Sequence, residues 1–158
     1  MKWSEVVDNP MFTNLPFKIE LTRFGKLLMS PASNAHGRMQ SRISAYLLQR
    51  RPDGEVITEC SIATADGVKV ADIAWLSSDF VAKHGFATPY PAAPELCIEI
   101  LSPSNTWVEM RDKVTCYLNT GAQEVWLVHN LERIDIYHHE GPSHHSLFIP
   151  APLMLDSR

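Results

Sequence analysis

The sequence of 158 residues predicts an α+β fold formed as one domain, with a hairpin and two long helices around a group of strands. Two segments, 35–50 and 107–120, carry apolar residues at helical spacing, whereas 17–21 alternates apolar and polar residues as a strand does. A chain of this length buries roughly 68–70% of the surface that its unfolded form exposes, so it can form a true core. We expect the core over 15–138, followed by an edge strand and a tail over 139–158.

The N-terminal part is expected to contain a short helical turn, a hairpin and the first long helix. Residues 3–9 form the turn, which Pro10 ends. The strand at 17–21 pairs, through a turn at Gly25, with a second strand over 26–29. The first long helix combines apolar residues with two polar ones on its inward face: His36, Met39, Gln40, Ile43, Tyr46 and Leu47.

The middle of the chain is expected to supply most of the sheet. Three extended pieces lie at 55–59, 62–70 and 72–76, and an Asp66-Gly67 turn interrupts the second of them. The segment 78–94 contains a glycine and three prolines, so we expect a long surface loop. The strongly apolar segment 95–101 indicates a strand buried inside the sheet.

The second long helix has the clearest boundaries in the sequence. Thr106 and Glu109 match the S/T-x-x-E capping box, and Gly121 supplies the C-terminal stop. Two further strands, 124–128 and 134–138, are expected to close the sheet. The predicted inward face of the helix consists of apolar residues: Trp107, Met110, Val114 and Tyr117.

Composition and charge restrict the function and the surroundings of the protein. The formal net charge is −4, whereas proteins that bind nucleic acid through many non-specific phosphate contacts are usually basic. The negative net charge does not exclude a nuclease, because a carboxylate metal site is acidic until its cation binds. The sequence has no apolar run near the roughly 20 residues of a membrane span, no secretory signal at its start, and three widely spaced cysteines. We therefore expect a cytoplasmic protein that does not bind membranes.

Two acidic residues, Asp72 and Glu99, are the first candidate metal ligands. Asp72 opens a predicted strand, and Glu99 lies inside the apolar run 95–101. A carboxylate buried in such a run is costly unless a partner compensates its charge. Magnesium binds one or two protein carboxylates in many sites, and the carbonyl of Ile100 can supply a further oxygen. On spacing alone, a turn aspartate and a solvated glutamate on an edge strand explain the same two residues.

Lys113 is a candidate third member of this site. On a helical wheel it lies at the flank of the apolar face of the second helix. A lysine at such a flank can bury its stem and bring its ammonium group to the rim of a cleft. There it can orient a metal-bound water or neutralise charge in a transition state. The alternative is an exposed i,i+4 pair with Glu109, which the sequence alone favours.

Several motifs resemble those of the Uma-type restriction endonucleases, a branch of the PD-(D/E)XK nuclease superfamily. The most specific is the run PELCIEILSPS at 94–104. Weaker similarities are spread along the chain: 17–21, 29–31, His36, 71–75, 109–113, Tyr117 and 121–128. The resemblance covers about residues 15–138. It implies a restriction-endonuclease-like core, with a mixed central sheet flanked by two long helices and preceded by an N-terminal β-hairpin.

The resemblance also implies catalytic roles for five residues: Asp72, Glu99, Lys113, Glu20 and His36. The first two would hold the metal, together with the carbonyl of Ile100. Lys113 would replace the lysine that the superfamily motif usually places two residues after its acid, where Leu101 stands here. The last two resemble additional active-site residues of the family, on its first hairpin and helix.

Four positions depart from the family pattern, and none of them removes a predicted site residue. Ala71 replaces a usual proline, and the others replace aspartates: Glu95, Glu109 and His129.

The histidine pairs at 138–139 and 144–145 raise the alternative of a transition-metal site. Neighbouring residues of a strand point to opposite faces, however, and no set of zinc ligands is completed around these histidines.

We therefore predict a magnesium-dependent endonuclease that hydrolyses phosphodiester bonds, with DNA favoured over RNA and manganese as an alternative ion. The ion would polarise the scissile phosphate and lower the pKa of an attacking water. A homodimer is expected, because two-fold symmetry suits the cutting of both strands of a duplex. The competing hypothesis is a non-catalytic module on the same fold that binds nucleic acid or protein, which the acidic net charge favours somewhat.

Overall fold

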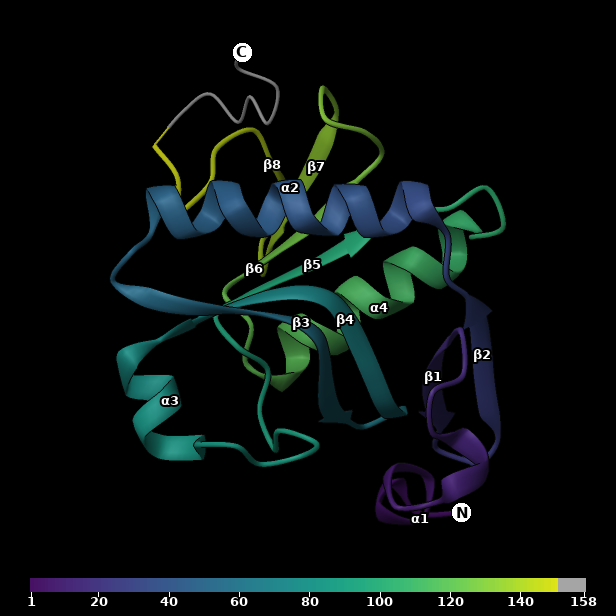
Figure 1. The fold of residues 1–158 in the computed structure, drawn as a ribbon. Helices are drawn as coiled ribbons and strands as arrows, with labels where there is room; N and C mark the ends of the chain where they lie inside the picture. The colour runs from purple at the N-terminus through teal and green to yellow at the C-terminus, as the bar shows by residue number, and fades with distance from the viewer. Residues whose placement is uncertain (151–158) are drawn as a thin grey trace.

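A computed structural model describes residues 1–150, and Figure 1 shows its sheet with helices on both faces. The C-terminal part of the predicted tail, 151–158, lies outside the described residues. In chain order the elements are α1 (Trp3–Val7), the 3-10 turn η1 (Pro10–Phe12), β1 (Phe17–Thr22), β2 (Leu27–Pro31), α2 (Asn34–Arg50), β3 (Gly54–Thr64), β4 (Gly67–Ser77), α3 (Ser78–His84), β5 (Leu96–Ile100), α4 (Trp107–Thr120), β6 (Glu124–Val128), β7 (Ile134–His138) and β8 (Gly141–Ser143).

The strands form one mixed sheet in the order β2-β1-β4-β5-β6-β7-β8, and β3 pairs with β4 beside this path. The pair β5–β6 is parallel, and α4 connects its two strands. The other pairs among the described strands are antiparallel. The N-terminal hairpin and the mixed sheet with its two long helices confirm the predicted α+β fold class.

Two hydrophobic clusters lie on the two faces of the sheet. One cluster contains Met110 and Tyr117 of α4, together with residues of α3. The other contains Ile43 and Leu47 of α2, together with Ile149 from the C-terminal segment. Figure 1 shows α2 and α4 on either side of β5. The sheet is therefore covered on both faces, which keeps the side chains of its central strand away from water.

The strands in the middle of the chain are longer than predicted. The three extended pieces expected at 55–59, 62–70 and 72–76 form one continuous hairpin, β3–β4, with its turn before Gly67. Gly67 has φ +94°, a conformation that glycine adopts without strain. Cross-strand pairing over this length merges pieces that appear separate in the sequence.

The prediction of a loop throughout 78–94 is wrong in its first half, where α3 forms. Ser77 caps this helix, because its hydroxyl accepts a hydrogen bond from the backbone N–H of Phe80. Gly85 follows the last residue of the helix, and the ring of Phe80 packs into the core. The two apolar residues that contact the core, Phe80 and Val81, are adjacent in sequence and give too little periodicity to predict such a helix. None of the helices formed by residues 1–150 is long and apolar enough to cross a membrane.

The inward face of α4 also differs from the prediction. Trp107, which was expected on that face, is 48% exposed. Met110, Val114 and Tyr117 are buried as predicted, and Lys113 joins them on the inward face. The alternative of an exposed lysine is therefore wrong, because Lys113 is only 7% exposed.

Candidate metal centre

Asp72 and Glu99 lie on the neighbouring strands β4 and β5, and both are almost completely buried. One oxygen of Asp72, Oδ2, accepts a hydrogen bond of 2.7 Å from the backbone N–H of Ile100. The alternative of a solvated glutamate on an edge strand is wrong, because β5 has partners on both sides. Two buried carboxylates so close together require compensating charge.

Lys18 of β1 supplies part of that charge, although the sequence-based prediction missed it. Its ammonium nitrogen Nζ lies 2.7 Å from Oδ1 of Asp72 and 3.2 Å from Oε2 of Glu99. The sequence offered one clue to this role. Lys18 is two residues from Glu20, and residues two apart on a strand share a face. That face of β1 therefore points two charged groups at the carboxylates.

Glu20 and Lys113 form the second half of the cluster. Nζ of Lys113 lies 2.9 Å from Oε1 of Glu20 and 3.4 Å from the carboxylate of Glu99. The hydroxyl of Tyr117 donates a 2.6 Å hydrogen bond to Oε1 of Glu99, and the backbone N–H of Val70 donates one of 2.8 Å to Glu20. The lysine thus joins α4 to β1 and β5 through charged groups that are shielded from water.

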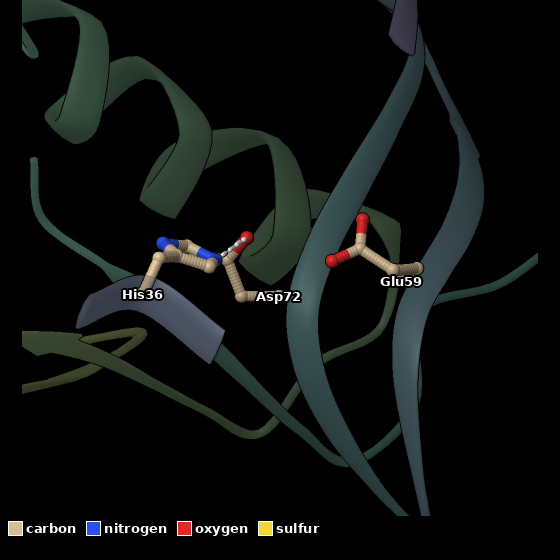
Figure 2. Close-up of side chains that lie close together, drawn as sticks. All are labelled: His36, Glu59 and Asp72. Carbon is tan, nitrogen blue, oxygen red and sulfur yellow. Dashed lines mark ion pairs between the residues drawn. The ribbon is translucent and has the colours of Figure 1, made fainter. Parts of the chain in front are cut away.

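His36 approaches the same centre from the start of α2. Its Nε2 lies 3.3 Å from Oδ1 of Asp72, and Figure 2 shows the imidazole ring directed at that carboxylate. The carboxylate of Glu59, on β3, lies on the other side of Asp72. One ligand atom from each of these three side chains lies within 4.8 Å of the others, so they form a second set of donors that shares Asp72.

The β3–β4 ladder is interrupted where Glu59 and Asp72 would face each other. The pairs on either side are regular, but Glu59 has φ +53°, which is uncommon for a residue other than glycine. The side-chain amide of Gln40 donates to the backbone carbonyl of Asp72 at 2.8 Å and to Oε1 of Glu59 at 2.7 Å. Gln40 therefore compensates for the interrupted ladder and holds the two strands in place. The sequence-based prediction did not include Glu59.

The two central carboxyl groups have opposite pKa shifts. Burial by itself raises the pKa of Asp72, but the hydrogen bond from His36 and the charge of Lys18 outweigh it and lower the pKa. Burial raises the pKa of Glu99, and the charges of Lys113 and Lys18 offset this only in part. The hydrogen bond to Asp72 raises the pKa of His36. Asp72 is thus held as an anion, the form that binds a metal.

The centre opens into a cavity of about 280 Å³ between β1, α2 and the start of α4. Its donors fit a hard cation, because Asp72 and Glu99 supply oxygens around a position beside the positively charged Lys18. The set that includes His36 also suits manganese, since imidazole favours transition metals. The backbone of Ile100 adjoins the site through its N–H, and a contact from its carbonyl stays a prediction.

Two histidines outside this centre pair with carboxylates. His138 contacts the buried carboxylate of Glu124 at 2.8 Å, and His129 contacts Asp135 at 2.6 Å. All three cysteines are free, as expected for a chain without a disulfide framework. Burial raises the pKa of the Cys60 thiol to about 12, which disfavours the thiolate form.

Comparisons with known proteins give a family and a fold. The family model described as "Uma2: Putative restriction endonuclease" matches residues 5–152. A solved structure from Anabaena variabilis, described as a putative nuclease belonging to DUF820, has a TM-score of 0.68 and 20% sequence identity. The similarity covers 79% of this chain and 74% of that one. None of the curated proteins matches the chain.

Proposed function

The chain belongs to the Uma2 family, whose model is described as a putative restriction endonuclease, and from this premise we propose a divalent-metal-dependent endonuclease that hydrolyses phosphodiester bonds of DNA. The observation that carries the proposal is the pair of buried carboxylates, Asp72 and Glu99, beside Lys113 at the wall of a cavity. Family membership supports a nuclease. The choice of metal rests on the chemistry of the site, and the choice of DNA rests on the description of the family as a restriction endonuclease.

In this proposal Asp72, Glu99 and the carbonyl of Ile100 would hold magnesium, with manganese as the alternative ion. When bound, the ion would supply Lewis acidity at the scissile phosphate and lower the pKa of the attacking water. Asp72 keeps its negative charge because His36 and Lys18 lower its pKa. The hydrogen bond from Tyr117 fixes the orientation of the Glu99 carboxylate.

Lys113 is proposed as the residue that orients the attacking water or neutralises charge as the phosphodiester bond breaks. Its ion pair with Glu20 at 2.9 Å positions the ammonium group next to Glu99. Glu20 is therefore a positioning residue that acts through Lys113. His36 contributes from the opposite side of Asp72, where its Nε2 lies 3.3 Å from Oδ1 of that carboxylate.

A nuclease assay with purified protein tests this proposal. Plasmid DNA, duplex oligonucleotides and RNA are each incubated with magnesium, with manganese and with a chelator. We expect cleavage of DNA that needs the metal and falls roughly 100-fold or more in Asp72→Asn, Glu99→Gln and Lys113→Met, since each variant removes an electrostatic element of the site. Lys69→Met is the matched control, because Lys69 is a buried lysine that pairs with Asp66 outside this site.

The second candidate function is a non-catalytic binding module on the same fold. It is favoured by the net charge of −4 and by the engagement of Lys113 with two carboxylates. In that case the protein would bind metal or nucleic acid, but no substrate would be cleaved under any of these conditions.

Light scattering tests the proposed homodimer in the same samples, and a monomeric mass would contradict it.

A further inference from the structure

The ammonium group of Lys18 lies where the two proposed metal ligands come together. It is 2.7 Å from Oδ1 of Asp72 and 3.2 Å from Oε2 of Glu99, so one positive charge bridges two carboxylates. A divalent cation that binds both carboxylates must come close to the same oxygens. The ammonium group of Lys18 and a divalent cation cannot both lie beside these oxygens, because the two positive charges would repel each other and the ion pairs of Lys18 would be lost.

The charges of the buried cluster favour an exchange of the two cations. Three buried carboxylates, those of Glu20, Asp72 and Glu99, face two ammonium groups, those of Lys18 and Lys113. This leaves one negative charge in excess. Replacement of the Lys18 ammonium by a divalent cation neutralises the cluster, whereas addition of the cation without displacement of the lysine would leave an excess of positive charge.

The two lysines differ in the ion-pair partners that each would keep after a cation binds. Lys113 also pairs with Glu20, which is not among the proposed ligands, so it keeps this partner. The carboxylates that pair with Lys18 are both proposed ligands. The side chain of Lys18 is 14% exposed and lines the cavity, which gives the displaced ammonium group a path towards water.

We propose that Lys18 is a tethered counter-cation, which holds Asp72 and Glu99 together in the metal-free protein and is displaced into the cavity when a divalent cation binds. This inference rests on the proposed function, since it assumes that these carboxylates bind a metal. It identifies Lys18 as a positioning residue that sets the affinity of the site for its ion. The metal-free cluster is thereby kept stable at the expense of that affinity.

Binding of Mn²⁺ to the full chain, measured from the loss of the free-ion signal in electron paramagnetic resonance, tests the proposal without any assay of activity. Lys18→Met keeps most of the length of the side chain but removes its charge. We expect this variant to bind Mn²⁺ at least about tenfold more tightly than the wild type. Lys18→Arg keeps the charge and should retain an affinity near that of the wild type. Lys69→Met is the control for loss of a buried, paired lysine elsewhere.

The outcomes separate this proposal from the proposed function. If the wild type binds Mn²⁺ and Lys18→Met binds it equally or more weakly, the role of Lys18 is wrong while the metal site stands. If neither protein binds Mn²⁺, both proposals fail.

Should Lys18→Met not fold, reductive methylation of the wild type followed by mass spectrometry gives a second measurement. Mn²⁺ should increase the labelling of Lys18 and leave Lys113 protected by Glu20. Labelling of Lys18 that does not change with Mn²⁺ would overturn the proposal.

Discussion

Replacing Lys113 with methionine keeps much of the bulk of the side chain but removes the ammonium group that pairs with Glu20 and Glu99. Lys113 and Glu20 are each 7% exposed and Glu99 is 2% exposed, so the variant leaves two carboxylates in a poorly solvated place. Removal of one partner of a buried ion pair costs about 3–5 kcal/mol. We expect the lower end of this range, because Glu20 keeps the N–H of Val70 and Glu99 keeps the hydroxyl of Tyr117.

Urea unfolding of the metal-free protein in the presence of a chelator measures this loss. Glu109→Gln is the matched control, because glutamine can also complete the capping box with Thr106. It should change the free energy of unfolding by no more than about 0.5 kcal/mol. A loss below about 1 kcal/mol in Lys113→Met would refute the buried bridge, since an exposed pair with Glu109 would be worth only about 0.3–0.5 kcal/mol.

Two further predictions concern stability. The lowered pKa of Asp72 stabilises the folded protein above the ordinary aspartate range near pH 4, and this contribution is lost as the pH falls through the folded-state pKa. In chelator, the difference in unfolding free energy between wild type and Asp72→Asn should therefore shrink below about pH 4, and a difference independent of pH would contradict the pKa shift. Ser77→Ala removes the cap of α3 and a hydrogen bond to Glu95, so urea unfolding should show a loss of about 1–2 kcal/mol. Ser78→Ala, one residue further on, should lose less, and an equal loss would argue against the cap.

Much of the fold was predictable because the relevant signals are local. The capping box at Thr106 and Glu109 and the glycine at 121 bound α4 as expected. The apolar run around Glu99 is a central strand, because only a strand buried on both faces carries so few polar residues. The first half of 78–94 was not predictable in this way, since α3 depends on a cap and on two adjacent core residues rather than on periodicity.

The candidate site was predictable only in part. The sequence pointed to Asp72 and Glu99, and the structure places them on neighbouring strands. Lys18 was not recognised, because its contact with Glu99 joins positions 81 residues apart. Glu59 escaped notice for a similar reason, since its approach to Asp72 depends on a local interruption of the β3–β4 ladder.

The sequence by itself determined the two long helices, most of the strands and which two acids occupy apolar or strand-end positions, because these properties depend on neighbours along the chain. The tertiary structure alone decided how the charges are shared. It buried Lys113 between Glu20 and Glu99, and it placed Lys18 between Asp72 and Glu99. The physical reason is that ion pairing depends on distance and burial, which the packing of β1 and α4 against the sheet sets.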